Sequence, residues 1–336
     1  MEMKEYIREF TLTDVVSVRN PKVVALGGGT GLSVILRGLK KYTRRLTAVV
    51  TVGDDGGSSG MLREDLGILP PGDIRNCILA LADDENVMQS LFNYRFEGGG
   101  LEGHNFGNLF LAAMNGISHD FYDAVRRTSD VLQIKGRVLP VTLDNMVLMA
   151  ELDNGERVEG ESKIPTFAIQ EDSAIRHIYL KKPGLRPLEE TLEAIKEADI
   201  IIIGPGSIYT SVIPNLLVEG IEEAIEDNRG KKFYIGNIMT QPGESTGMTE
   251  ADHIRAIEAH QKRRGKRLFH YAVLNNGVLP ENVADNYKKY GAESVPLGDL
   301  DPRYAYILDN FIIVEEGRVR HDADLLARRI FETYVK

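Results

Sequence analysis

The feature that most constrains the fold is an apolar run that ends in a glycine-rich turn near the start of the chain. Residues 22–26 suit a buried strand of a parallel sheet, and the turn Gly27-Gly28-Gly29-Thr30-Gly31 follows directly. Apolar residues then recur at helical spacing from Leu32, so we expect a helix to begin near Gly31. This order of strand, turn and helix presents backbone N–H groups to an anion such as phosphate. The alternative is a tight turn with only a structural role.

The glycine turn matches neither of two common phosphate-binding signatures. Depending on which glycine is counted first, the GxGxxG pattern would need its third glycine at Leu32 or at Val34. No Gly-Lys-Ser/Thr follows, so the turn is not a P-loop. An ordinary NAD-dependent oxidoreductase is therefore disfavoured.

Composition and charge exclude several functional classes. The chain has 336 residues, a net charge of −10 and a single cysteine, Cys77. Nonspecific nucleic-acid binding requires a positive field, so we expect no nucleic-acid partner. No apolar run approaches the ~20 residues of a transmembrane segment, and the first residues lack a signal-peptide core. Cys77 cannot form an internal disulfide and is expected to be a small buried residue of a cytoplasmic protein.

Polar, glycine-rich loops follow five of the predicted strands. They span residues 27–33, 53–60, 204–211, 237–244 and 275–277. Parallel strands end at one edge of a sheet, so these loops should line a single crevice, where α/β proteins bind ligands. The loop at 204–211 repeats the order of strand, glycine turn and helix, and adds the hydroxyl groups of Ser207 and Thr210. This convergence favours a nucleotide or nucleotide-sugar ligand.

Two adjacent aspartates stand in the second of these loops. Asp54 and Asp55 could accept hydrogen bonds from sugar hydroxyls or hold a hydrated divalent cation, and Ser58 could donate to phosphate. The alternative is a turn whose residues provide only backbone freedom. The chain contains no His-x-x-x-His spacing.

Two further polar segments stand at predicted helix starts. Asp73 is expected to cap a helix over residues 74–82, which places Arg75 in the first turn, where a cation opposes the helix dipole. Arg75 should therefore have an anionic partner, either a ligand or a nearby acidic residue of the chain (Asp54, Asp55 or Glu64).

The second segment, around residues 104–108, combines a histidine with two asparagines. Asn105 and Asn108 suit the edges of a base or the hydroxyls of a sugar. His104 is better explained as a cap or a core hydrogen-bond partner than as an acid–base group.

The pattern changes between the two halves of the chain, over about residues 138–164. Asn154-Gly155 separates two strand-like runs, which is typical of a type I′ hairpin. We expect an antiparallel excursion from the main sheet here. Other expected elements are a main-sheet strand at 178–180, a helix over 214–226, a capping box at Thr249-x-x-Asp252, a short strand at 294–297 and a terminal hairpin over 311–320. Residues 1–20 are expected to form an N-terminal arm, which leaves 21–336 as the main domain.

Taken together, the motifs resemble the YvcK family of gluconeogenesis factors. The motifs are GGGTG at 27–31, GDDGGSSG at 53–60, HNFGN at 104–108, GPGS at 204–207 with Thr210 and Ser211, and NIMTQPG at 237–243. The resemblance extends from about residue 21 to the C-terminus. The family is similar in fold to 2-phospho-L-lactate transferase. The resemblance therefore implies a Rossmann-like three-layer α/β/α fold with a mostly parallel sheet and an inserted antiparallel hairpin.

The resemblance also implies a function and a set of ligand-binding residues. Family members are cytoplasmic bacterial proteins that support cell shape and growth on gluconeogenic carbon sources, and they bind UDP-sugars such as UDP-N-acetylglucosamine. The implied phosphate contacts are Gly28, Gly29, Thr30, Gly31, Gly206, Ser207 and Thr210. The polar groups implied around the ligand are Asp54, Asp55, Asn105, Asn108 and Asn237.

Two functions remain open at this stage. A regulatory UDP-sugar-binding protein would require no cofactor and would act through a cell-envelope synthesis protein or a regulatory protein. A magnesium-dependent transferase, like 2-phospho-L-lactate transferase, would use Asp54 and Asp55 to hold the metal and as its catalytic residues. The transferase shares GGTG and GDD with this chain, whereas its deazaflavin-binding regions have no counterpart here. The sequence leaves open which sugar is bound and whether the protein forms a homo-oligomer.

Overall fold

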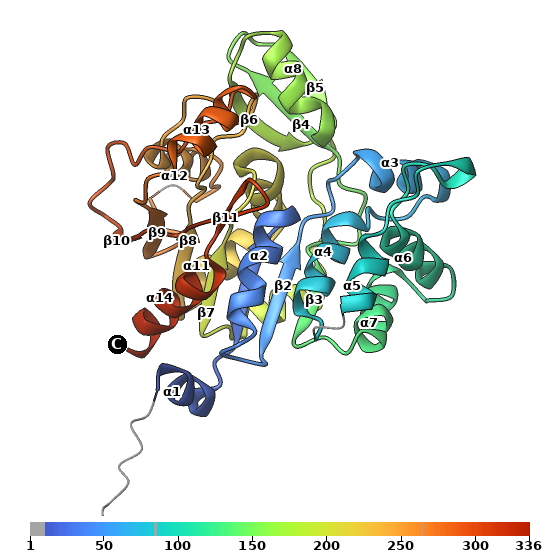
Figure 1. Ribbon diagram of the computed structural model, residues 1–336, viewed down its shortest axis with the longest axis horizontal. Helices are drawn as coiled ribbons and strands as arrows, with labels where there is room; N and C mark the ends of the chain where they lie inside the picture. The colour runs from blue at the N-terminus through green and yellow to red at the C-terminus, as the bar shows by residue number, and fades with distance from the viewer. Residues whose placement is uncertain (1–10, 84–85, 264) are drawn as a thin grey trace, which may run out of the picture.

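The computed structural model describes residues 11–83, 86–263 and 265–336, and its centre is a seven-stranded parallel sheet (Figure 1). The strands are β1 (Val23–Gly27), β2 (Leu46–Val50), β3 (Arg137–Pro140), β7 (Ile200–Ile203), β8 (Lys231–Ile235), β9 (Tyr271–Asn275) and β10 (Ala305–Asp309). Their order is β3-β2-β1-β7-β8-β9-β10, and every neighbouring pair is parallel. The direction of winding reverses between β1 and β7. In such sheets the crevice beyond this switch point is the usual ligand site.

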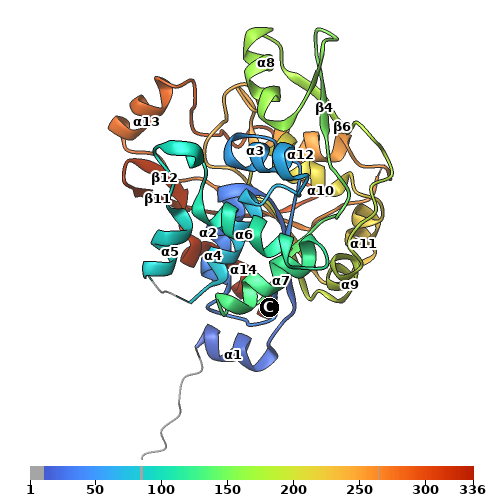
Figure 2. The same ribbon diagram turned by 90° about the vertical axis from the view of Figure 1, so that its right-hand side faces the viewer.

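Helices cover both faces of the sheet, which confirms the three-layer α/β/α prediction. On one face α2 (Gly29–Leu39) packs against both α4 (Gly72–Leu81) and α14 (Ala323–Val335). On the other face α9 (Glu189–Glu197) packs against α11 (Ile221–Asp227), and Figure 2 shows these two helices on the side of the sheet opposite α2 and α4. The remaining helices are α1 (Leu12–Arg19), α3 (Gly57–Leu66), α5 (Asn86–Asn93), α6 (Phe106–Gly116), α7 (Phe121–Val131), α8 (Ile164–Gln170), α10 (Ile213–Leu216), α12 (Glu250–Ala259) and α13 (Glu281–Lys288), with short helical turns η1 (Gly99–Leu101), η2 (Glu161–Lys163) and η3 (Ile208–Val212).

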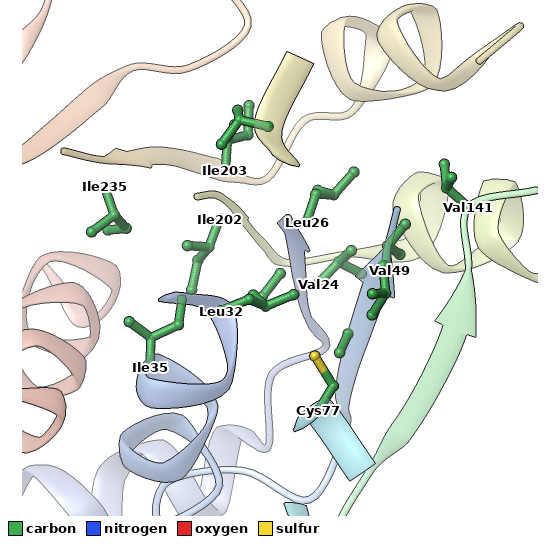
Figure 3. Close-up of a cluster of buried hydrophobic side chains, with 14 of the residues drawn as sticks. Val24, Leu26, Leu32, Ile35, Val49, Cys77, Val141, Ile202, Ile203 and Ile235 are labelled. Carbon is green, nitrogen blue, oxygen red and sulfur yellow. The ribbon is translucent and has the colours of Figure 1, made fainter. Parts of the chain in front are cut away.

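The hydrophobic core lies between the sheet and its two helical layers. Every residue of β1, β2 and β7 is buried, which explains why these strands read as continuous apolar runs. Part of the core, including Leu32 of α2 and Cys77 of α4, is drawn in Figure 3. Cys77 is fully buried, as predicted, and burial raises the pKa of its thiol well above the usual range.

A small lobe with its own antiparallel sheet lies above the carboxyl edge of the main sheet (Figure 1). It consists of β4 (Leu148–Leu152), β5 (Arg157–Glu159), β6 (Ile175–Leu180) and α8. The predicted hairpin is confirmed, because β4 and β5 pair antiparallel and Gly155 has a φ of +89° in the turn.

The extent of this lobe differs from the expected excursion over 138–164. At its start, β3 belongs to the main sheet, where it pairs parallel with β2. At its end, the segment expected as a main-sheet strand at 178–180 is β6, which pairs antiparallel with β4. The burial pattern of β6 explains the difference, since Arg176 and His177 are exposed while Ile178 is buried. A strand inside the main sheet would be buried on both faces.

Several other predictions can be compared with the structure. The capping box at Thr249 and the terminal hairpin, β11 (Ile312–Glu315) with β12 (Arg318–His321), are confirmed. The helix expected over 214–226 is divided into α10 and α11, because Gly220 between them has a left-handed φ of +76°. Residues 294–297 form only a bridge from Ser294 to Met239, and the seventh strand is β10 instead.

Only part of the predicted N-terminal arm can be compared with the structure. Within it, residues 12–19 form α1, whose first turn is capped by Thr11, and α1 packs against α14. Residues 1–10 lie outside the described part of the chain. Within the described residues, no helix combines the length and apolar character needed to cross a membrane.

Candidate functional site at the carboxyl edge of the sheet

The turns after β1 and β7 meet at the switch point. A Cβ added to Gly31 would lie 2.7 Å from the carbonyl oxygen of Pro205, so only glycine allows this approach. Asn237, after β8, fixes the second turn: its Oδ1 accepts the N–H of Gly206 at 3.2 Å, and its Nδ2 donates to the Gly206 carbonyl at 2.8 Å. Asn237 therefore positions the turn. The fifth predicted loop, at 275–277, is held instead to the start of the C-terminal hairpin, because Asn275 Oδ1 accepts the N–H of Phe311 at 3.0 Å.

The N-terminus of α2 faces a carboxylate of the chain. Gly29 has a φ of +63°, and its N–H donates to the side chain of Asp73. A Cβ on Gly28 would lie 2.7 Å from Asp73 Oδ2. Asp73 therefore occupies the position where the sequence predicts a phosphate group. Burial, followed by the nearby negative charge of Asp54, raises the pKa of Asp73 to about 7.

The prediction that Asp73 caps a helix is wrong. Helix α4 begins at Gly72, with Pro71 at the capping position, so Asp73 lies inside the first turn. The earlier start is stabilised by α3, because Ser59 Oγ accepts the N–H of Gly72 at 3.2 Å. This contact and the contact of Asp73 with Gly29 bring the N-termini of α2, α3 and α4 together.

The turn after β7 holds a second internal carboxylate. Glu244 Oε1 accepts the N–H groups of Tyr209 at 2.8 Å and Thr210 at 3.1 Å, and its Oε2 accepts the Thr210 hydroxyl at 3.1 Å. Both Glu244 and Thr210 are buried. Burial raises the pKa of Glu244, while these three donors oppose the rise. Ser207 is more accessible, but its hydroxyl donates to Gln241 Oε1 at 2.5 Å.

Asp54 and Asp55 bind backbone groups in two different parts of the molecule. Asp54 Oδ1 accepts the N–H of Gly56 at 2.9 Å, at the start of α3. Asp55 Oδ1 accepts the N–H of Ser162 at 2.8 Å, which links the main body to the lobe. Over the described ranges, no three acidic, histidine or cysteine side chains are placed to hold a metal ion.

The lobe adds an acidic residue, Glu161 of η2, that the sequence did not indicate. Burial raises the pKa of Glu161 to about 8, and the charges of Asp54 and Asp73 add to the increase, followed by those of Glu244 and Asp55. No local pattern marks Glu161, because its acidic neighbours come from distant segments of the chain. The carboxyl edge of the sheet therefore carries a strong negative charge at high pH, where these side chains are ionised.

Arg75 is a partly buried cation whose side-chain partners are neutral. Its Nη1 donates to Asn108 Oδ1 at 3.0 Å, and its Nη2 donates to Asn76 Oδ1 at 2.7 Å. Burial, followed by the charge of Arg95, lowers the pKa of Arg75. In the part of the chain that the structure describes, Arg75 forms no ion pair with a carboxylate, and its Nε has no hydrogen-bond partner. Of the two alternatives for Arg75, the salt bridge to Asp54, Asp55 or Glu64 is therefore not formed, and the guanidinium remains suited to an anionic ligand.

The two asparagines of the 104–108 motif position Arg75. Asn108 accepts a hydrogen bond from Arg75, and Asn105 holds the start of the helix that carries Asn108. Asn105 caps α6 by accepting the N–H of Asn108 at 3.2 Å, and its own N–H donates to Ser58 Oγ at 3.2 Å. Both asparagines and Ser58 are buried. His104 Nδ1 lies 3.4 Å from Ser58 Oγ, in keeping with a hydrogen-bonding role.

Comparisons with known proteins identify the family. A family model described as 2-phospho-L-lactate transferase CofD matches residues 23–307. A relative from Clostridium acetobutylicum is 53% identical over 319 residues, covering 94% of this chain and 70% of that protein. The gluconeogenesis factor of Bacillus subtilis is 44% identical over 314 residues, covering 92% of this chain and 96% of that protein. The chain belongs to the YvcK family of gluconeogenesis factors.

A solved structure agrees with this assignment. The crystal structure of a UPF0052 family member from Bacillus halodurans has a TM-score of 0.85 and 43% sequence identity to this chain, covering 92% of this chain and 98% of that chain. The YvcK fold described above is therefore shared by a relative at substantial sequence identity.

A cavity lies beside the turn after β7 in this YvcK chain. Its volume is about 790 Å³, and it separates the lobe from α12. Tyr209 and Glu244 line the cavity and also belong to the carboxyl edge. His260 lines it from the other side; burial lowers the pKa of His260 to about 4, and its Nε2 accepts the N–H of Ile178 at 2.9 Å.

Proposed function

We propose that this protein is a cytoplasmic UDP-sugar-binding regulator that supports growth on gluconeogenic carbon sources and cell shape through a partner protein. The observation that carries the proposal is the meeting of the N-termini of α2, α3 and α4 at the switch point. Each N-terminus presents backbone N–H groups and a positive dipole end. A diphosphate carries two adjacent anionic groups, which suits several such termini better than one.

The surroundings of these termini also suit a nucleotide sugar. Arg75 supplies a cation with neutral partners, and the loop residues Asp54 and Asp55 supply acceptors for sugar hydroxyls. Relatives carry the name gluconeogenesis factor, which fits a regulatory role.

Calorimetric titration of UDP-N-acetylglucosamine, with and without magnesium, tests this function. We expect saturable binding, with the nucleotide recovered intact by chromatography. Arg75→Gln should weaken binding at least tenfold, because it removes a charge-assisted contact from a partly buried position. The matched control is Arg126→Gln, which removes an exposed arginine of α7 that is paired with Asp123, and it should bind like the wild type. If both variants bind UDP-N-acetylglucosamine with equal affinity, Arg75 does not contact the ligand. The absence of wild-type binding would overturn the proposed function.

A magnesium-dependent transferase acting on a nucleotide diphosphate is the second candidate. The match to the family model for 2-phospho-L-lactate transferase and the acidic carboxyl edge both favour it. The carboxylates of Asp54 and Asp55 accept backbone N–H groups, and the described segments place no three acidic, histidine or cysteine side chains together to hold magnesium. Conversion of UDP-N-acetylglucosamine to UDP or another product, dependent on magnesium and lost in Asp55→Asn, would support this candidate over the regulator.

A further inference from the structure

Both positions predicted to hold phosphate are occupied by carboxylates of the chain, but the two are held differently. Glu244 receives three donors at the turn after β7 and is buried beneath it. Asp73 receives one N–H, from Gly29, and faces the like charge of Asp54. Ionised Asp73 is therefore held far less firmly than Glu244, so an anion can replace it more readily.

We infer that Asp73 competes with a phosphate group of the ligand for the N–H groups at the start of α2, so that ligand binding is strongest when Asp73 is neutral. This inference rests on the proposed function and adds the regulation of that site by pH. The ionised carboxylate both accepts the Gly29 N–H and repels phosphate. The neutral acid repels no anion and can donate to a phosphate oxygen.

The charged and titratable groups around Asp73 come from three parts of the structure. Asp54 faces it from the loop after β2, and Glu161 faces it from the lobe. Arg75 and Cys77 belong to the same helix, and the charge of Arg75, like the N–H of Gly29, favours the ionised form of Asp73. Burial and the charge of Asp54 therefore outweigh Arg75 and the Gly29 N–H, and the pKa of Asp73 rises to about 7.

The sign of the pH dependence follows from this arrangement. The pKa of Asp73 is about 7, so the neutral acid predominates at pH 6 and the carboxylate at pH 8. UDP-N-acetylglucosamine remains doubly ionised over this range, so its own charge does not change. Binding should weaken as pH rises, by up to about tenfold per pH unit above the pKa of free Asp73. Ligand binding should also take up a proton, by up to about one per ligand near pH 8.

The test is titration of UDP-N-acetylglucosamine into wild type and Asp73→Asn at pH 6, 7 and 8 without divalent cations. Each titration is run in two buffers of different ionisation enthalpy, which gives the proton uptake. Asparagine keeps an acceptor for the Gly29 N–H but carries no charge. We expect Asp73→Asn to bind about tenfold more tightly than wild type at pH 8, with a flat pH profile and no proton uptake.

Two further variants exclude other sources of the pH effect. Asp65→Asn removes an exposed carboxylate of α3 and should behave like the wild type. Glu161→Gln removes the carboxyl of the lobe, whose pKa is also raised, and should leave most of the slope in place. If Glu161→Gln flattens the profile and Asp73→Asn does not, the inference is overturned.

Sulfate separates failure of this inference from failure of the proposed function. Sulfate is a doubly charged anion from pH 6 to 8, and it stabilises a folded protein that binds it. At pH 8, sulfate should raise the melting temperature of Asp73→Asn more than that of wild type. If UDP-N-acetylglucosamine binds neither protein but this difference persists, only the proposed function fails. If the sugar nucleotide binds with the same affinity and slope in both proteins, or sulfate stabilises both equally, the competition by Asp73 is overturned.

Discussion

Single residues fix the site through close backbone approaches. Gly31 is the clearest case, because a Cβ there would meet the carbonyl oxygen of Pro205 at 2.7 Å and the carbonyl carbon at 3.0 Å. Both atoms belong to the backbone, which cannot move aside as a flexible side chain can. The two turns come from neighbouring strands, β1 and β7, so their contact depends on the sheet order.

Gly31→Ala should therefore destabilise the protein. The added methyl must separate α2 from the turn at Pro205, and overpacking of this kind typically costs about 1–3 kcal/mol. Urea unfolding followed by circular dichroism measures the loss. Gly116→Ala, at the end of α6, is the control, because a Cβ there meets nothing within 4 Å. If the two variants unfold at the same urea concentration, the contact between the turns has no energetic importance.

At the scale of elements, the sequence predicted what depends on local pattern. Buried runs identified β1, β2 and β7, and the Asn154-Gly155 turn identified the β4–β5 hairpin. The sequence did not show that β6 pairs with β4, because strand pairing is decided by contacts between distant segments. The same limit explains Asp73: its local pattern is typical of a helix cap, whereas its actual partner is Gly29.

For the site too, the sequence predicted where the loops lie but not the contacts between separate elements. The glycine turns do lie at one edge, as parallel topology requires. The sequence could not show that Thr210 donates to Glu244, or that Glu161 reaches the edge from the lobe. These contacts form only when separate elements pack together.

Asp55 connects two elements, and its loss should loosen the lobe. Its Oδ1 accepts the N–H of Ser162 at 2.8 Å, and a hydrogen bond to a charged acceptor contributes ~1.5–3 kcal/mol. Asp55→Ala should increase amide exchange of η2 and α8 by about tenfold or more, with the main sheet unchanged. Asp55→Asn retains the acceptor and is the matched control. Hydrogen exchange measured by mass spectrometry distinguishes them, and equal exchange in the two variants would rule out this link.

At the scale of the whole molecule, the lobe is an insertion whose ends lie side by side. Leu148 pairs with Leu180, and the N–H of Lys181 donates to the carbonyl of Val147 at 2.9 Å. No strand of the lobe belongs to the seven-stranded sheet. The main sheet is therefore complete without the lobe, although buried lobe residues such as Ala150 and Ile178 belong to the same hydrophobic core. The lobe contributes Glu161 and the contact to Asp55, so it belongs to the site more than to the framework.

Replacing residues 149–179 with a short glycine–serine turn should therefore give a folded but less stable protein. Paired strand ends lie about 5 Å apart, a distance that a two-residue turn spans. His260 Nε2 would lose the N–H of Ile178, and Tyr209 would lose its cover, so the melting temperature should fall by several degrees. Circular dichroism shows whether the deletion variant is folded, and thermal unfolding measures its melting temperature. Inserting the same linker between Asn154 and Gly155, at the exposed hairpin tip, should change little. A deletion variant without a cooperative transition would show that the lobe is required for the main sheet to fold.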